Sequence, residues 1–234
     1  MMAKSAAKAK HGEERGSRGK PREKPALSNN VGAVPRKPRS LSPEARRTAI
    51  LAAALDEFTA RGYEGARLDD VAKRAGVAKG TIYLYFADKE TLFQELVRSM
   101  VHPVLGTLEK LREVDIPARV LVETLLTTFV REVYATRRKD IIRLILSEGP
   151  RFPTIAEFYY REVIGRVLSI VRPILRRAAE RGELPDDALA RFPQLIVAPM
   201  LVGIVWHGLF DKFDHLDVAE MAKAHVGILF GRAQ

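Results

Sequence analysis

The chain of 234 residues contains no cysteine, which excludes disulfide bonds and thiolate chemistry. This composition fits a reducing compartment, and we expect the protein to be cytoplasmic. Long apolar runs are also missing. The best candidate, residues 195–206, spans about twelve residues and includes Pro199 and Gly203, whereas a membrane span needs roughly 18 to 20 apolar residues. The amino terminus lacks the apolar stretch of a secretory signal, so we expect no membrane partner.

Catalytic motifs are scarce as well. None of the five histidines has metal-ligand spacing to another, and the chain has neither a glycine-rich phosphate loop nor a nucleophile elbow. The acidic pairs Asp69–Asp70 and Asp186–Asp187 stand at predicted helix starts, where capping explains them. The sequence therefore indicates no enzyme, no metal site and no cofactor.

The residues that are present favour an all-α fold. Apolar residues make up 47% of the chain, which is enough for a sizeable core. Runs of Ala, Leu, Arg and Glu dominate, and alternating β-branched residues are scarce.

Positive charge is concentrated in residues 1–40, which hold eleven Lys and Arg against three Glu, a net charge of +8. The whole chain carries +10, so the other residues contribute only +2. This segment has few large apolar residues, and we expect a disordered basic arm. It is either a solvating leader or mis-assigned start, or a flexible arm that adds phosphate contacts to a DNA-binding neighbour.

The first predicted helix covers residues 43–61, with Ser42 as its cap, Pro43 at its first position and Gly62 as its end. A short second helix follows, and a third is predicted over residues 79–85. Between them, Gly76 allows a sharp turn at positive φ. Small and apolar residues flank this bend, namely Ala72, Val77 and Ile82. The spacing is typical of a helix-turn-helix.

The third helix has two different faces. Ile82 and Phe86 lie on the side that we expect to be buried. The other face presents groups suited to a DNA major groove, which contact phosphates, base edges or a thymine methyl group. These residues are Lys79, Gly80, Thr81, Tyr83, Leu84 and Tyr85. Asp88 is the predicted cap of a fourth helix, where Lys89 and the helix amino terminus suit a phosphate. The alternative is that the tyrosines complete the core and the lysines are solvated.

Residues 43–98 resemble the DNA-binding domain of the TetR family of transcriptional repressors. The motifs that carry the resemblance are "RGYEGA", "DDVAKRAGV", "KGTIYLYF" and "DKETLF". It implies a homodimer whose helical carboxy-terminal domain binds a small molecule. The matching DNA-contact positions are Arg67, Lys79, Gly80, Thr81, Tyr83, Leu84, Tyr85 and Lys89. Residues 143–164 resemble the carboxy-terminal segment of a subset of this family.

Two positions depart from the family pattern. Ala78 replaces the usual capping serine of the recognition helix, a loss of about 1 kcal/mol. Arg67 stands where a small hydroxylic residue is common, so it gains a phosphate contact and loses a cap.

Residues 41–100 hold nine Lys and Arg and nine Asp and Glu, a net charge of zero. Acids such as Asp56, Glu57 and Glu64 are therefore expected to be turned away from DNA.

Beyond residue 100 the pattern remains helical. The expected helices cover about residues 89–112, 117–137, 139–147, 153–181, 187–210 and 217–231. Pro173 and Pro199 lie inside two of them, and we expect kinks that open an apolar cavity. Nearby large side chains are Phe129, Phe152, Phe158, Tyr159, Met200 and Trp206, each of which the alternative assigns to a plain bundle core. The ligand-contact residues stay unknown.

The last two helices, 187–210 and 217–231, are apolar enough to form an isologous four-helix dimer interface, with close approach at Ala198, Gly203 and Gly208. The predicted domains are 1–40 (basic arm), 41–100 (DNA-binding helix-turn-helix) and 101–234 (helical regulatory and dimerisation domain). The resulting hypothesis is a ligand-responsive repressor that binds a pseudo-palindromic DNA operator as a homodimer and takes a small apolar ligand. The alternatives are a DNA-binding protein of the same fold without small-molecule control, and a basic-armed protein that binds anionic membranes or RNA.

Overall fold

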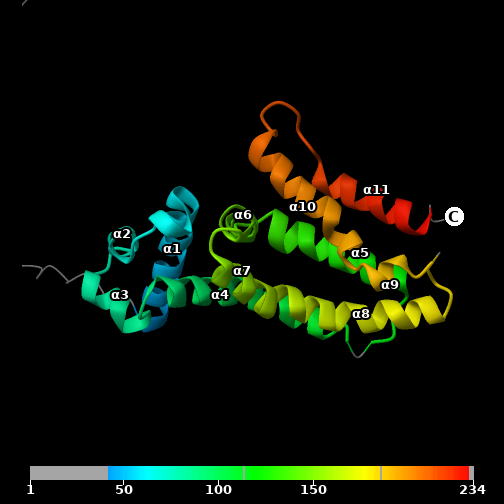
Figure 1. The fold of residues 1–234 in the computed structure, drawn as a ribbon, viewed down its shortest axis with the longest axis horizontal. Helices are drawn as coiled ribbons and strands as arrows, with labels where there is room; N and C mark the ends of the chain where they lie inside the picture. Colours follow the sequence, from blue (N-terminus) through cyan, green and yellow to red (C-terminus); the bar gives the residue numbers. More distant parts are fainter. Residues whose placement is uncertain (1–41, 113, 185, 232–234) are drawn as a thin grey trace, which may run out of the picture. The chain divides into compact units, whose positions relative to one another are not determined.

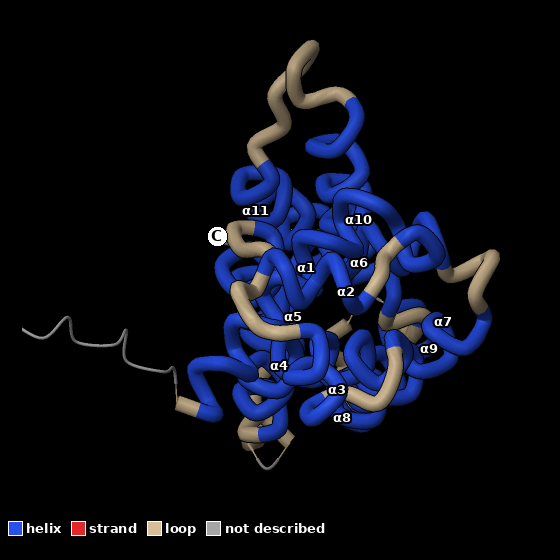
Figure 2. The backbone as a smooth tube through the Cα atoms, turned by 90° about the vertical axis from the view of Figure 1, so that its left-hand side faces the viewer, coloured by secondary structure: helices blue, strands red, loops and turns tan. Residues whose placement is uncertain are grey.

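The computed structural model describes residues 42–112, 114–184 and 186–231, and this part of the chain contains helices and loops but no strand (Figure 2). The α-helices are α1 (Pro43–Gly65), α2 (Leu68–Arg74), α3 (Lys79–Tyr85), α4 (Lys89–Glu109), α5 (Ala118–Thr128), α6 (Arg138–Glu148), α7 (Pro153–Tyr159), α8 (Gly165–Glu180), α9 (Ala188–Arg191), α10 (Gln194–Leu209) and α11 (Val218–Phe230). Two π-helical segments, η1 (Phe129–Tyr134) and η2 (Tyr160–Ile164), continue α5 and α7. The all-α prediction is confirmed. The prediction for the basic arm lies outside the described residues.

Helix α1 begins and bends where its sequence predicts. The Ser42 hydroxyl accepts a hydrogen bond from the Ala45 amide at 3.1 Å. Gly62 adopts φ 70° and ψ 175°, which interrupts the helix one residue after the predicted end, and a further turn continues to Gly65. A side chain with a Cβ is strongly disfavoured in this conformation.

The turn between α2 and α3 has the hydrogen bonds of a Schellman motif. The Val77 amide donates to the Ala72 carbonyl at 3.0 Å, and the Gly76 amide donates to the Lys73 carbonyl at 3.2 Å. Gly76 has φ 67°, as predicted for the bend. Ile82 then packs fully buried on the inner side of α3. The α2–turn–α3 pair is therefore a helix-turn-helix, supported by α1 and α4.

Figure 1 shows α1, α2 and α3 grouped at the amino-terminal end of α4, and α5, α8, α10 and α11 grouped around its carboxy-terminal half and beyond. The first core cluster joins α1–α4 to α6, α7 and η2, since it includes Ile141, Ile155 and Val163. A second cluster joins α5, α8, α10 and α11. The domain boundary predicted at residues 100–101 thus falls within α4.

Three predicted helices differ from the observed ones. Residues 117–137 and 153–181 contain the π segments, which apolar spacing does not reveal, because one extra residue in a turn keeps the pattern helical. The predicted helix 187–210 breaks at Phe192, which has φ −123° and ψ 68°, outside the α region. Pro193 follows it and disfavours the α conformation of the preceding residue. The break leaves α9 and α10 as separate helices.

Pro173 and Pro199 lie inside α8 and α10 as predicted, and Pro103 lies inside α4, where the sequence analysis overlooked it. No helix in the described ranges combines the length and the hydropathy needed to cross a membrane.

Candidate nucleic-acid interface

The outer face of α3 is the most exposed apolar surface of the helix-turn-helix. Leu84 is 84% exposed and Tyr83 is 47% exposed, whereas Ile82 between the turn and these residues is fully buried. Lys79 and Gly80 are exposed at the helix start, and Thr81 is half-buried. Because a leucine this exposed contributes little to folding, its side chain is available to a binding partner.

Tyr85 differs from the expected outward orientation. It is half-buried against the first core cluster, and its hydroxyl donates to the Pro43 carbonyl at 3.4 Å. Tyr85 follows Leu84 by 100° around the helix and so lies on the margin of the buried face. The alternative that Tyr85 helps to complete the core therefore applies in part.

Lys79 is paired within the protein. Its Nζ lies 2.7 Å from Asp69 Oδ2, and this hydrogen bond, together with the charge of Asp69, raises the pKa of Lys79 above its ordinary value. Lys79 is therefore cationic at neutral pH. A DNA phosphate that binds Lys79 must either share the ammonium group with Asp69 or displace the Asp69 carboxylate.

The start of α4 is less open to phosphate than its sequence suggests. The Asp88 carboxylate accepts a hydrogen bond from the Thr91 amide at 2.7 Å, which lowers the pKa of Asp88. Lys89 Nζ donates to the Glu64 carbonyl at 2.9 Å and lies 4.9 Å from the centre of the Tyr63 ring. Burial lowers the pKa of Lys89. These contacts indicate that Lys89 anchors α4 to the end of α1 in addition to any phosphate contact.

Arg67 and Ala78 precede α2 and α3, and neither was expected to cap the helix that follows it. Neither residue makes a side-chain capping hydrogen bond to the helix that follows it. Arg67 is exposed and forms no ion pair with any described residue. Of the predicted DNA contacts, Arg67 is thus the most available cation.

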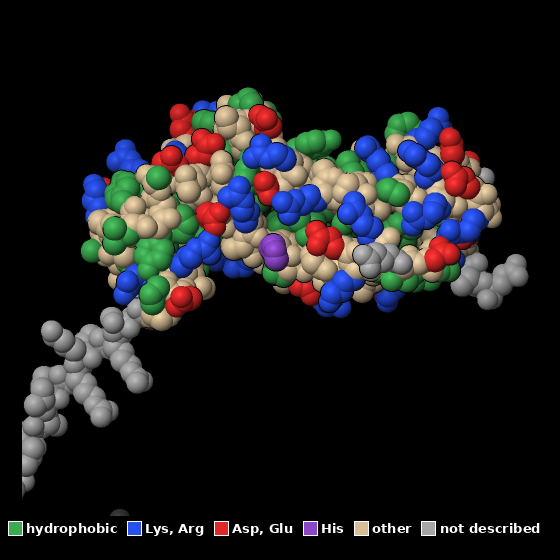
Figure 3. All heavy atoms as spheres, turned by 90° about the horizontal axis from the view of Figure 1, so that it is seen from below, with side chains coloured by type: hydrophobic (Ala, Val, Ile, Leu, Met, Phe, Trp, Pro, Cys, Tyr) green, Lys and Arg blue, Asp and Glu red, His purple; other side chains and the backbone are tan. Residues whose placement is uncertain are grey.

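The three acids expected to turn away from DNA pair with arginines. Asp56 lies 2.6 Å from Arg137, and Glu64 lies 2.6 Å from Arg151. Glu57 is almost fully buried and pairs with Arg61 at 2.8 Å and Arg74 at 3.2 Å. On the face that Figure 3 shows, Lys and Arg side chains are interspersed with Asp and Glu. Residues 41–100 carry no net charge, so general electrostatic attraction gives this region little affinity for DNA.

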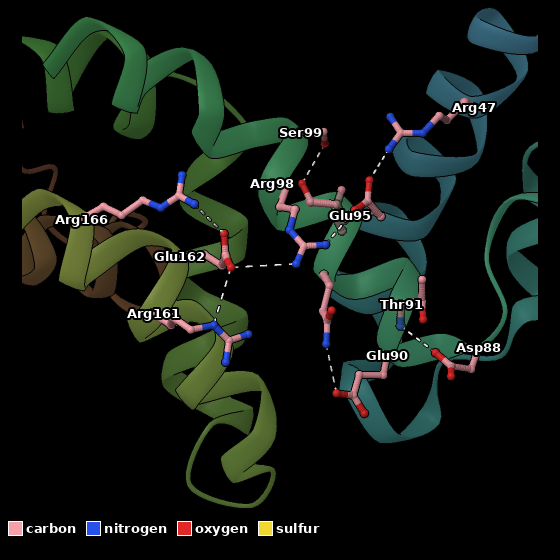
Figure 4. A network of polar contacts seen from close by, with 12 residues as sticks. Arg47, Asp88, Glu90, Thr91, Glu95, Arg98, Ser99, Arg161, Glu162 and Arg166 are labelled. Carbon is pink, nitrogen blue, oxygen red and sulfur yellow. Dashed lines mark hydrogen bonds and ion pairs between the residues drawn. The ribbon is translucent and has the colours of Figure 1, made fainter. Parts of the chain in front are cut away.

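A chain of ion pairs connects α1, α4 and η2, and the sequence analysis did not find it because its members are far apart in the chain (Figure 4). Arg47 of α1 pairs with Glu95 of α4, and Glu95 pairs with Arg98 at 2.8 Å. Arg98 lies 3.9 Å from Glu162 of η2, which also pairs with Arg166 at 3.3 Å. Each exposed pair contributes only about 0 to 1 kcal/mol, but together they position η2 against α4.

A cavity of about 330 Å³ lies between the carboxy-terminal half of α4 and segments of α5, η1, α6, η2, α8 and α10. Phe129 and Tyr159 line it, as does Pro193. Of the large side chains that the sequence placed around it, four do not line it, namely Phe152, Phe158, Met200 and Trp206. Pro173 and Pro199 do not line it either, so the effect of kinks at these prolines on the cavity stays a prediction. The π segments, whose widened turns are frequent at functional sites, lie in its wall instead.

Tyr159 is the most strongly perturbed titratable residue in this wall. Burial alone raises its pKa to about 12. The phenol is therefore neutral at physiological pH and able to donate a hydrogen bond.

Helices α10 and α11 leave large aliphatic side chains exposed. Val202 is 55% exposed, Leu209 is 59% exposed, and Ile228 of α11 is 79% exposed. Val202 and Leu209 are seven residues apart and share one helix face. This face has no partner among the described residues and is more apolar than a solvated helix requires.

The small residues of α10 serve internal packing. A Cβ on Gly203 would lie 2.7 Å from Val218 of α11, and one on Gly208 would lie 3.3 Å from Arg143 of α6. Ala198 lines the cavity. For Gly203, which is buried, the expected close approach of a second chain is therefore not supported, because Val218 fills the adjacent space. Ala198 and Gly208 are exposed, so for them the expectation stays a prediction.

A helix-turn-helix with an exposed recognition helix, joined by α4 to a cavity-bearing helical domain, defines a DNA-binding regulator. Residues 50–96 match the family model of bacterial regulatory proteins of the TetR family, and residues 119–224 match that of a tetracycline repressor-like carboxy-terminal domain. This protein belongs to the TetR family of transcriptional regulators.

Named relatives agree with this assignment. The chain is 25% identical over 179 residues to the HTH-type transcriptional regulator SrpR of Pseudomonas putida, covering 76% of this chain and 82% of SrpR. It is 39% identical over 187 residues to the uncharacterised HTH-type transcriptional regulator YhgD of Bacillus subtilis, covering 77% of this chain and 94% of YhgD. Its fold is similar to that of FadR from Bacillus subtilis in complex with stearoyl-CoA, with a TM-score of 0.61, 20% identity, and coverage of 80% of this chain and 99% of FadR.

Proposed function

We propose that this protein is a ligand-responsive transcriptional repressor that binds a pseudo-palindromic operator as a homodimer. The main support for the proposal is that some residues line the cavity and also belong to the core cluster that packs under the DNA-binding helices. Ile141 of α6 and Val163 of η2 are members of both. A ligand that moves these side chains must also disturb the packing under α1 and α4.

Helix α4 provides the second connection. Its first half contributes Leu92, Phe93 and Leu96 to the core of the helix-turn-helix. Its second half contributes Val101 and Leu105 to the cavity. A small tilt of α4 therefore changes the separation of the two recognition helices, which must be about 34 to 36 Å to enter successive major grooves. Coupling of this kind typically amounts to about 1 to 3 kcal/mol.

The test is to select bound duplexes from sheared genomic DNA and to screen compounds for both stabilisation of the protein and release of the selected operator. Val167→Trp places a large side chain in the cavity wall and is expected to abolish both effects. Val120→Trp, at a valine that is 43% exposed, is the matched control. Operator binding that no stabilising compound alters would favour the same fold without small-molecule control. Absence of any preferred duplex would refute the proposal.

The homodimer part of the proposal is supported by the exposed aliphatic face of α10 and α11. A symmetric partner would cover this face on both chains at once. We expect the double variant Val202→Glu with Leu209→Glu to be monomeric at micromolar concentration in sedimentation experiments. Leu146→Glu changes a leucine that is 49% exposed on α6 and should leave the dimer intact. A wild-type chain that sediments as a monomer would refute this part.

Residues 1–40 are proposed to add non-specific affinity for DNA, because the helix-turn-helix region itself has no net charge. Removal of residues 1–38 is expected to reduce the dependence of operator binding on salt concentration. An unchanged slope would leave the arm without this role. A cytoplasmic location remains a prediction that accords with transcriptional regulation.

A further inference from the structure

The chemistry of the cavity wall restricts the kind of ligand that the proposed function requires. Of the described residues that line the cavity, all but four are apolar and none is acidic. The four polar ones are Thr128, Arg138, Tyr159 and Gln194. The buried part of this wall desolvates the portion of a ligand that lies against it, so each polar group there matters for selectivity.

Among the described residues that line the cavity, Arg138 is the only charged one, and its side chain is already engaged. Arg138 Nε donates to the Met100 carbonyl at 2.6 Å, and its Nη1 donates to the Glu132 carbonyl at 2.9 Å. The same nitrogen lies 3.4 Å from the Glu132 carboxylate. These contacts tie the start of α6 to α4 and to η1. An anionic ligand would have to compete with them to bind Arg138.

Two neutral hydroxyls in the wall are not engaged. Thr128 is buried at the end of α5, and its hydroxyl makes no hydrogen bond with any described residue. The Tyr159 hydroxyl likewise has no partner in the described part of the chain. Each residue stands immediately before a π-helical segment, Thr128 before η1 and Tyr159 before η2. A ligand group that pairs with either hydroxyl therefore gains a hydrogen bond that the fold leaves unmade.

We infer that the cavity takes an uncharged amphiphile, with an aliphatic body and a single hydroxyl or carbonyl group that bonds to Thr128 or Tyr159. This inference rests on the proposed function and specifies its ligand. A carboxylate or an ammonium group would lose its hydration without a free counter-charge in the wall.

The experiment is calorimetric titration of the full chain with three probes that share one alkyl chain, namely 1-decanol, decanoate and decyltrimethylammonium, at pH 7.5. We expect 1-decanol to bind on the order of tenfold more tightly than either ion, because a buried ion costs more desolvation than a hydroxyl. Decanoate binding as tightly as 1-decanol would overturn the inference and assign an anion site to Arg138. Binding of none of the three would overturn it as well.

Shape-conserving variants locate the polar contact. Thr128→Val or Tyr159→Phe should weaken binding of 1-decanol about three- to tenfold, the effect of one neutral hydrogen bond. The matched controls are the exposed neighbours, Thr127→Val and Tyr160→Phe, which should have no effect. If neither cavity variant weakens binding, the assigned hydroxyls are wrong. Operator release is measured separately, so a probe that binds without releasing DNA refutes ligand control while leaving the ligand chemistry intact.

Discussion

Helix α3 contains two side chains of similar size, Ile82 and Leu84, whose truncation to alanine should have different effects. Truncation of Ile82 should lower the stability of the fold, and truncation of Leu84 should lower the affinity for DNA. Ile82 is fully buried, and Leu84 is 84% exposed. Ile82→Ala removes the side-chain carbons beyond Cβ from a packed core, at roughly 0.8 kcal/mol for each methylene plus the cost of the cavity that remains. The expected loss of folding free energy is about 3 to 4 kcal/mol. For a domain of this size the melting temperature should fall by about 6 to 15 °C.

Leu84→Ala should leave folding almost unchanged, by less than about 0.5 kcal/mol, because its side chain has few contacts to lose. Its effect is expected on DNA instead. Half-burial of a leucine against a groove contributes on the order of 1 kcal/mol for each recognition helix, so the affinity of the proposed homodimer for its operator should fall about thirtyfold.

The two variants are compared by thermal unfolding and by fluorescence anisotropy on the selected operator, at a temperature where both are folded. Ile82→Ala should lose stability with little loss of affinity per folded molecule. Leu84→Ala should lose affinity at unchanged stability. Equal melting temperatures for the two variants, or a Leu84→Ala protein that binds the operator as well as the wild type, would refute the assigned faces of α3.

Four other substitutions test the backbone at two glycines, the Lys79–Asp69 pair and the ion-pair chain. Gly62→Ala should cost about 1 to 3 kcal/mol of folding free energy, since its backbone is accessible almost only to glycine, and Gly76→Ala should cost about 1 kcal/mol, since its positive φ is the only obstacle. Equal melting temperatures for the Gly62→Ala and Gly76→Ala variants would contradict the expectation that Gly62→Ala is the more destabilising. Asp69→Asn should tighten operator binding in anisotropy titrations by releasing Lys79; unchanged affinity would mean that Lys79 does not meet DNA. Glu162→Gln should preserve operator affinity without ligand but reduce the effect of a ligand on it by about 0.5 to 2 kcal/mol. A wild-type ligand response in the same titrations would exclude the ion-pair chain from coupling.

Features that depend only on residues close together in the sequence could be predicted from the sequence. The bounds of α3, the positive φ of Gly76 and the missing cap at Ala78 all follow from local backbone preferences. The burial of Ile82 and Phe86 follows from helical spacing in the same way. The family motifs extend over this same segment, which is why the helix-turn-helix and the DNA-binding class were accessible before the structure.

Features that depend on residues distant in sequence were not predictable. Gly203 is a small residue of the kind expected at a dimer contact, but Val218 of the same chain fills the adjacent space. The cavity lies beside two π-helical turns rather than beside the expected prolines, and apolar spacing does not distinguish a π turn from an α turn. Lys89 is engaged by the Glu64 carbonyl, a contact that only the packing of α4 on α1 creates. Hydrogen bonds and packing between distant segments form only when the helices assemble, so local preferences define which helices exist, whereas their assembly determines which side chains remain free for DNA and ligand.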